Sequence, residues 1–254
     1  DERFSRNFLR RQVMPLLAER WPQVTASLAR SAGHLSEAQQ LLDELAGTDL
    51  LAARGVCALP WLPLPSLDLS AVTALSDARQ RNLLRYWLAP LSRMPDSDHW
   101  AGWYDLRDAA VDATPIWKLA DGELHRAEGR LWWLSGDWLK PPQPLVLLNA
   151  TLADSVELPG NGRVNLSGEL PQGHWHLRYR VGGESLQVPG RGRRDLKRLL
   201  NEMRVPPFVR SRLPLLFYGD ELMAVANLTQ APGIEASGVR LHWSPPIGEQ
   251  GLSW

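Results

Sequence analysis

Positively charged side chains gather in one stretch of the sequence, from His174 to Arg212. This stretch contains ten Arg and Lys residues against three acids, although the formal net charge of the 254-residue chain is zero. Guanidinium and ammonium groups bind phosphate oxygens, and such a local excess is typical of a surface for a polyanion. The candidate phosphate-binding residues of the stretch are Arg178, Arg180, Arg191, Arg193, Arg194, Lys197, Arg198 and Arg210.

A well-solvated protein face is the alternative explanation for such a group of charges. The cations of this stretch, however, are distributed over a predicted strand, a loop and a helix of one compact unit. This distribution favours nucleic-acid binding over the alternative.

Two strands with a helix between them are predicted to position the cations. We call this segment, residues 174–219, the basic unit. Residues alternate in character from His174 to Val181, which predicts a strand with one buried and one solvated face. A Gly/Pro turn is predicted from Val188 to Gly192, and a second, buried strand from Leu215 to Tyr218. The buried face of the first strand is expected to consist of Trp175, Leu177, Tyr179 and Val181.

The helix is predicted to run from about Arg194 to Met203. Its apolar residues have the i, i+3, i+4, i+7 spacing of a buried stripe, which consists of Leu196, Leu199, Leu200 and Met203. At about 100° per residue, Arg194, Lys197, Arg198 and Asn201 fall on the opposite side. The acids Asp195 and Glu202 are predicted to lie on a flank, away from the cations.

A second group of polar residues lies near the start of the chain, in a predicted helix over residues 1–21. Pro15 cannot donate a backbone hydrogen bond, so the segment is expected to be one helix or two helices hinged there. Arg6, Asn7 and Arg10 share one side of this segment. They are further candidates for nucleic-acid binding, and a solvated helix face is again the alternative.

The sequence contains no recognisable catalytic set. His174 and His176 share a strand face, but a metal site needs three or four ligands and the neighbouring arginines would repel a cation. Cys57 lies in an apolar, proline-rich segment and is expected to serve packing. A hairpin turn explains Asp220 and Glu221 without catalysis. A Gly-rich phosphate loop followed by Lys and Ser or Thr is absent from the sequence.

Length and composition limit the other classes of protein. A single cysteine cannot form an internal disulfide, which fits a cytoplasmic location. The sequence has neither a signal-peptide pattern nor an apolar run of about 20 residues, so no membrane partner is expected. Because the chain begins with Asp, we expect a fragment or a processed product.

The remaining sequence predicts an α+β fold. Its expected elements are a long helix from Pro22 to about Leu45, an extended segment 55–69, a helix 78–88 that begins at Ser76-Asp77, three strands within 116–134, short strands within 145–181, and a last strand at 239–243. Asp121-Gly122 predicts a β-hairpin, because a type I′ turn needs positive φ. Trp132 and Trp133 are expected on opposite faces of their strand.

The predicted organisation has three parts. Residues 1–21 form a connecting helix, residues 22–140 a helical domain with a small antiparallel sheet, and residues 141–254 a mixed β domain that carries the basic helix. The boundary is placed in the proline-rich segment 135–144 (SGDWLKPPQP).

Several runs of the sequence resemble the C-terminal, non-catalytic region of bacterial tRNA(Ile)-lysidine synthetases. The resemblance rests on RRDLKRLL, VPPFVR and PLLFYGDELMAVA in the basic unit, on SDARQRNLLRYWLA and MPDSDHWAGWYDL further upstream, and on DERFSRNFLRRQVMPLL at the start. It covers nearly the whole chain. One departure concerns Arg204, where the family usually has Gly.

The resemblance implies a role in tRNA modification. Enzymes of this family use ATP, with magnesium, to adenylate the wobble cytidine of an isoleucine tRNA with a CAU anticodon, and then attach lysine. Their chemistry resides in an N-terminal domain with a Gly-Gly phosphate loop, which this sequence lacks. We therefore expect the chain alone to be inactive, to need no cofactor, and to hold the tRNA at least partly through its acceptor stem.

A protein–protein interaction module is the alternative interpretation. The chain has twelve tryptophans, and Trp-rich faces could bind a partner or form a homodimer.

Overall fold

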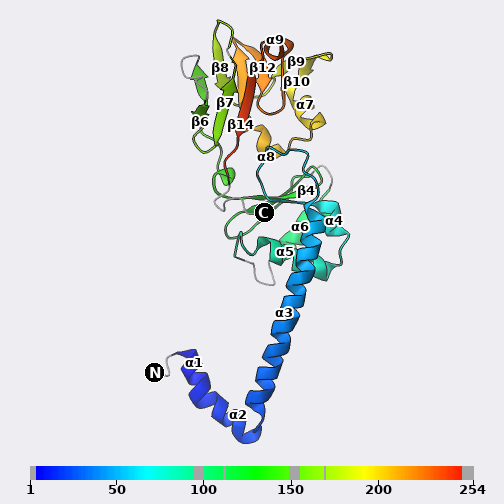
Figure 1. Cartoon of the computed structure of the whole chain (residues 1–254), viewed down its shortest axis with the longest axis vertical. Coiled ribbons are helices and arrows are strands. Elements are labelled where there is room, and N and C mark those ends of the chain that lie inside the picture. The colour runs from blue at the N-terminus through cyan, green and yellow to red at the C-terminus, as the bar shows by residue number, and fades with distance from the viewer. Residues whose placement is uncertain (1–3, 94–99, 111–112, 149–154, 169, 248–254) are drawn as a thin grey trace.

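A helical arm extends from a layered body in the computed structural model, and the two ends of the molecule are far apart (Figure 1). The structure describes residues 4–93, 100–110, 113–148, 155–168 and 170–247. Among these residues, no helix is both long enough and apolar enough to cross a membrane.

The arm contains α1 (Ser5–Phe8), a π-helical segment (Leu9–Val13), α2 (Met14–Arg20) and α3 (Val24–Arg54). The backbone stays right-handed helical from α1 into α2, so the chain is not hinged at Pro15. The wider π turn lies immediately before Pro15, which has no N–H to donate. Segment 5–20 is therefore one helix with a local widening.

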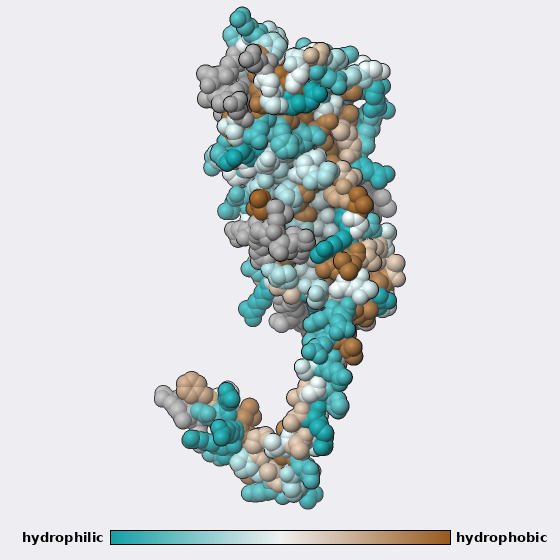
Figure 2. Space-filling view, in the orientation of Figure 1, coloured by the Kyte–Doolittle hydropathy of each residue, from teal (hydrophilic) through white to brown (hydrophobic). Residues whose placement is uncertain are grey.

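Helix α3 is longer than the prediction, which ended it at about Leu45. Its last turns bury Ala46, Leu50 and Ala53 against the body, so tertiary contacts extend the helix beyond Leu45. An apolar stripe of α3, which consists of Leu28, Leu35, Leu41, Leu42 and Leu45, is exposed along the arm. Apolar residues are visible on both legs of the arm in Figure 2.

The first layer of the body consists of helices and a small antiparallel sheet. The helices are α4 (Leu69–Thr73), α5 (Asp77–Leu88) and α6 (Ala101–Asp108). The strands are β1 (Ser66–Asp68), β2 (Ile116–Lys118), β3 (Glu123–Ala127) and β4 (Arg130–Leu134), in the order β1-β4-β3-β2. The predicted three-stranded meander is present, and the proline-rich extended segment supplies β1 as a fourth strand.

The hairpin predicted at Asp121-Gly122 is present between β2 and β3, but its turn is not of type I′. Lys118 pairs with Glu123, so four residues connect β2 and β3, and neither Asp121 nor Gly122 has a positive φ. The two-residue turn lies instead between β3 and β4, where Glu128 and Gly129 have φ values of 51° and 75°. A longer loop removes the need for left-handed backbone at Asp121.

Strand β4 is buried on both faces. As predicted, Trp132 and Trp133 point in opposite directions: Trp133 enters the core formed with α5 and α6, whereas Trp132 enters the core of the second layer. The small sheet therefore lies between the two cores and packs against both. Two successive tryptophans are accommodated because each face of the strand has its own core.

The second layer contains most of the strands. They are β5 (Val146–Leu148), β6 (Ser155–Glu157), β7 (Arg163–Ser167), β8 (Trp175–Arg178), β9 (Ser185–Val188), β10 (Gly192–Asp195), β11 (Leu215–Tyr218), β12 (Glu221–Val225), β13 (Thr229–Gln230) and β14 (Arg240–Ser244). Short helices α7 (Leu196–Glu202), α8 (Pro207–Arg210) and α9 (Pro232–Ala236) accompany them.

These strands form two sheets. The larger has the order β10-β9-β12-β11-β8-β5, with β13 beside β12, and is mixed because β9 and β12 are parallel. The smaller has the order β14-β7-β6 and is antiparallel. The predicted α+β class is confirmed: a helical layer with a small antiparallel sheet precedes a mixed β layer that carries a basic helix.

The proline-rich segment between the layers is fixed to the second layer. Trp138, in a 3-10 helix (Gly136–Leu139), is buried and donates its indole N–H to the carbonyl of Pro246 at 2.9 Å. The buried Arg212 guanidinium donates to the carbonyls of Asp137, at 2.6 Å, and Lys140. One apolar core thus contains residues from both sides of the predicted domain boundary between residues 140 and 141. This boundary stays a proposal.

Candidate nucleic-acid interface

The basic unit contains a β-hairpin that sequence analysis missed. Strands β9 and β10 pair antiparallel around a turn at Pro189-Gly190-Arg191, with Arg194 opposite Leu186. Helix α7 begins only at Leu196, because the carboxylate of Asp195 caps it by accepting the N–H of Arg198 at 3.0 Å. The prediction of a helix from about Arg194 is therefore wrong by two residues. An Asp directly before the LKRLL run was the signal for this boundary.

The predicted faces of the unit are partly confirmed. On α7, Leu196, Leu199 and Leu200 are buried. On the first strand, Trp175 and Leu177 are buried, but β8 ends at Arg178 and Val181 is exposed in the loop that follows. The alternation therefore identified the strand but extended it too far.

Four exposed cations form what we call the outer group: Arg191, Arg193, Lys197 and Arg198, on the β9–β10 hairpin and α7. Arg193 donates its Nε–H to Ser185 at 2.7 Å. Arg191 and Arg198 both pair with Glu202, at 2.8 and 3.3 Å. The prediction that Glu202 lies away from the cations is wrong, because the hairpin turn brings Arg191 to the last turn of α7.

Three half-buried arginines form the inner group: Arg178, Arg180 and Arg210. The Arg178 guanidinium lies over the Phe217 ring, 3.9 Å from its centroid. Arg178 and Arg180 pair with the buried Glu184 at 3.9 and 3.5 Å.

Arg210 belongs to the same group but also joins the two layers. It pairs with Glu128 in the β3–β4 turn at 3.6 Å and donates to the carbonyl of Val205 at 2.7 Å. Burial lowers the pKa of Arg210, Glu128 raises it, and the charge of Arg180 lowers it again.

Arg194 belongs to neither group. It lies on β10, is only half-exposed, and its Nε is buried without a hydrogen-bond partner among the described residues. The prediction that it shares a solvent face with Lys197 and Arg198 followed from treating it as helical.

Arg6, Asn7 and Arg10 are not brought near the other candidates. They lie on α1 and the π-helical segment, at the free end of the arm, whereas the hairpin and α7 lie at the opposite end of the molecule (Figure 1). Helix α3 alone has 31 residues, which corresponds to about 46 Å at 1.5 Å per residue. A single ligand could touch both sets only if it were as long as the molecule.

The remaining chemically interesting residues have structural partners. His176 stacks on Phe217, with ring centroids 5.2 Å apart, and burial together with the charge of Arg178 lowers the pKa of its imidazole. Gly219 and Asp220 form the turn of the β11–β12 hairpin, as predicted. In the described part of the chain, no three His, Cys, Asp or Glu side chains gather where they could hold a metal ion.

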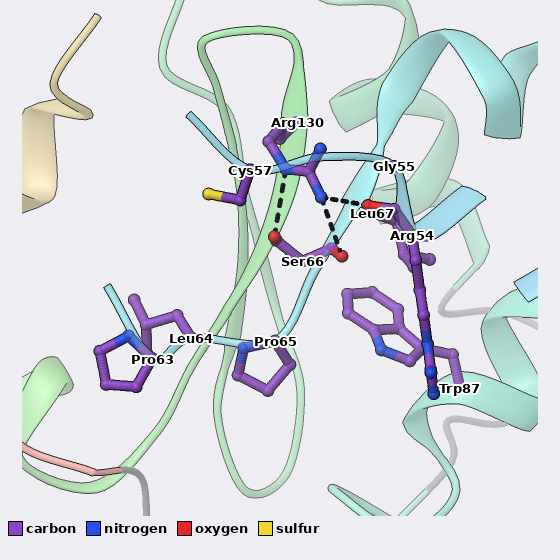
Figure 3. A pocket seen from close by; sticks show the side chains of 10 residues that line it. All are labelled: Arg54, Gly55, Cys57, Pro63, Leu64, Pro65, Ser66, Leu67, Trp87 and Arg130. Carbon is purple, nitrogen blue, oxygen red and sulfur yellow. Dashed lines mark hydrogen bonds between the residues drawn. The ribbon is translucent and has the colours of Figure 1, made fainter. Parts of the chain in front are cut away.

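A pocket of about 280 Å³ lies where the end of α3 meets β1 (Figure 3). Cys57 and Trp87 line it, and the buried Arg130 donates to the Ser66 side chain and to the carbonyls of Ser66 and Arg54. These bonds hold the end of the arm against the small sheet. We interpret the pocket as part of this joint.

The fold and the charge distribution together define a class of protein: an α+β chain with four exposed cations on one hairpin and one short helix. A family model described as "TilS substrate binding domain" matches residues 67–132. A second, described as "TilS substrate C-terminal domain", matches residues 175–243. The first range covers most of the helical layer, and the second contains the inner and outer groups.

Curated relatives match along almost the entire chain. The tRNA(Ile)-lysidine synthase of Pseudomonas fluorescens is 59% identical over 255 residues, which cover 99% of this chain and 57% of that protein. That of Pseudomonas aeruginosa is 56% identical, covering 100% and 58%, and that of Coxiella burnetii is 33% identical, covering 96% and 55%. The chain belongs to the tRNA(Ile)-lysidine synthase family and spans somewhat more than half the length of these relatives.

Proposed function

We propose that the chain binds the tRNA substrate of a tRNA(Ile)-lysidine synthase. The observation that carries this proposal is the outer group, four exposed cations within the range matched by the substrate C-terminal domain. The substrate would be an isoleucine tRNA with a CAU anticodon, held through its acceptor stem. Lysine addition to the wobble cytidine, with its ATP and magnesium, would require the part of the relatives' length that this chain does not span.

Contacts to phosphates explain how such a surface would work. Arginine and lysine side chains fix the register and orientation of an RNA backbone without reading its bases. The outer group offers charge at the surface, and the inner group offers arginines whose positions are fixed. The arm residues Arg6, Asn7 and Arg10 would contact a distant part of the same tRNA, which is an elongated molecule.

The salt dependence of tRNA binding tests the proposal. Each bound phosphate contributes about 0.7 to 0.9 to the slope of log affinity against log salt concentration. Replacing Arg193, Lys197 and Arg198 by Ala should therefore flatten the slope by about 2.1 to 2.7 and weaken binding at low salt. Leu196, Leu199 and Leu200 keep the helix in place, so melting should not change.

A matched control removes three positive charges elsewhere. Arg20, Arg30 and Lys118 are exposed and lie outside the basic unit. Their triple alanine variant should retain the wild-type slope. If the two triple variants have the same slope as the wild type, the outer group is only a solvated face and the proposal is wrong.

Protein–protein contact is the second candidate function, and the exposed stripe of α3 supports it. Leu28, Leu35 and Leu42 recur every seven residues and are 52%, 72% and 44% exposed. Trp-rich faces are not available for this role, since Trp21 is the only largely exposed tryptophan among those described. A dimer should appear as a doubled mass in light scattering, and Leu35→Glu should restore the monomer.

A further inference from the structure

Glu184 occupies an unusual position for a carboxylate beside a cationic surface. It lies in the loop between β8 and β9, and only 3% of its side chain is exposed. Its Oε1 accepts the backbone N–H groups of Val181 and Gly182, at 2.6 and 2.8 Å. Its own carbonyl accepts the N–H of Leu196 at 2.9 Å, which ties the loop to the start of α7.

The side chain of Glu184 is ionised despite its burial. Desolvation opposes ionisation, but the hydrogen bonds from Gly182 and Val181 and the charge of Arg180 outweigh it, so the pKa of Glu184 lies below its usual value. A fixed negative charge is therefore present under the sheet surface at neutral pH.

This charge holds two arginines of the inner group. Arg178 and Arg180 approach Glu184 from the end of β8 and from the loop, and 30% and 23% of their side chains remain exposed. Arg178 is confined further by the Phe217 ring. Each arginine thus pairs with the buried carboxylate while part of its side chain stays exposed.

Stability alone does not account for this arrangement. A buried ion pair recovers its desolvation cost only when its remaining polar atoms are hydrogen-bonded. Here Oε2 of Glu184 and Nε of Arg180 are buried without a hydrogen-bond partner among the described residues. The network is therefore incompletely satisfied, and what it achieves is the fixed placement of two cations.

We propose that Glu184 is the positioning residue of the interface: it holds Arg178 and Arg180 side by side so that both bind phosphates of one RNA backbone segment. The proposal rests on the proposed tRNA binding. Preorganised guanidinium groups lose less side-chain entropy on binding than free ones, so the acidic residue strengthens the binding of a polyanion.

General electrostatics makes the opposite prediction. Removing a negative charge beside a cationic surface increases its attraction for RNA. The sign of the change in affinity therefore separates positioning from simple charge balance.

The experiment compares Glu184→Gln with Glu202→Gln across a salt series with isoleucine tRNA. Both variants lose one negative charge beside arginines, but Glu202 is partly exposed and pairs with the outer group. We expect Glu184→Gln to bind about fivefold more weakly for each phosphate that is no longer held, and to flatten the slope by up to about 1.4 to 1.8. Glu202→Gln should bind as tightly as the wild type or more tightly.

Two further variants keep the test decisive. In a chain that carries Arg178→Ala and Arg180→Ala, adding Glu184→Gln should cause no further decrease in affinity if Glu184 acts through these arginines. Glu184→Asp keeps the charge and should restore part of the affinity, and it replaces the Gln variant if that variant does not fold.

The outcomes separate the inference from the proposed function. If the wild type binds tRNA and the Glu184 variants bind at least as tightly, or lose affinity equally without the two arginines, Glu184 is not a positioning residue. If the wild type shows no salt-dependent binding, the proposed function itself is wrong.

Discussion

Arg204 is the residue at which a single substitution should stabilise the protein. It follows α7 with φ of 52°, in the left-handed region. Its N–H bonds to the carbonyl of Asn201 and the next N–H, of Val205, to that of Leu200, both at 3.0 Å. This pattern is the Schellman motif, which favours glycine at the position of Arg204.

The expected gain follows from two opposing effects. A non-glycine residue with left-handed backbone costs about 1 to 2 kcal/mol, whereas glycine costs about 0.5 to 1 kcal/mol through the extra freedom of the unfolded chain. Arg204→Gly should therefore raise the free energy of unfolding by about 0.5 to 1 kcal/mol. For a chain of this length the melting temperature should rise by about 1 to 4 °C.

Urea unfolding and thermal melting of Arg204→Gly and Arg204→Ala measure this effect. The Arg204 side chain is exposed, so Ala removes the charge and keeps the backbone strain. The alanine variant should be close to the wild type. A glycine variant that is no more stable than the alanine variant would refute the assignment of strain to this position.

Three further predictions concern buried or half-buried groups. Arg210→Ala removes the ion pair with Glu128 and should lower the free energy of unfolding by about 1 to 3 kcal/mol in urea titrations. Arg212→Ala leaves the carbonyls of segment 135–144 unpaired, and limited proteolysis should cut that segment about tenfold faster or more. The lowered pKa of His176 means that the unfolded chain, with a His pKa of about 6.5, takes up a proton more readily. Stability should therefore fall as pH decreases below about 6.5, and His176→Gln should flatten the decline in melting temperature between about pH 7.5 and 5.5.

Periodic patterns predicted the elements of the fold well where the burial of a face decides the outcome. The leucines of α7 and the tryptophan pair of β4 have clear spacings, and their faces lie as expected. The length of α3 was missed because its end is fixed by contacts with α5, which no local spacing reveals. Strand β1 was only an extended segment in the sequence because it pairs with β4 across more than sixty residues.

Sequence analysis predicted which residues belong to the candidate site better than it predicted their arrangement in space. The charge count identified the basic unit, but it could not separate exposed cations from half-buried arginines. Arg210 and Arg178 illustrate the difference, because their partners, Glu128 and Glu184, lie in other elements. The β9–β10 hairpin was missed because β10 (GRRD) has no apolar alternation, so only its pairing with β9 defines it as a strand.

The two groups of cations differ in a way that bears on how the proposed interface would select an RNA. The outer group stands on an edge hairpin and a short helix, where its exposed side chains provide charge with less geometric demand than half-buried arginines. The inner group is held by Glu184, Phe217 and Glu128, so its arginines would bind phosphates only at fixed positions. On the proposed function, affinity comes mainly from the outer group and register from the inner one. Substitutions in the outer group should then weaken the binding of all tRNAs alike. Glu184→Gln should also reduce the preference for isoleucine tRNA over a tRNA with a different acceptor stem. An unchanged preference would show that register is set elsewhere.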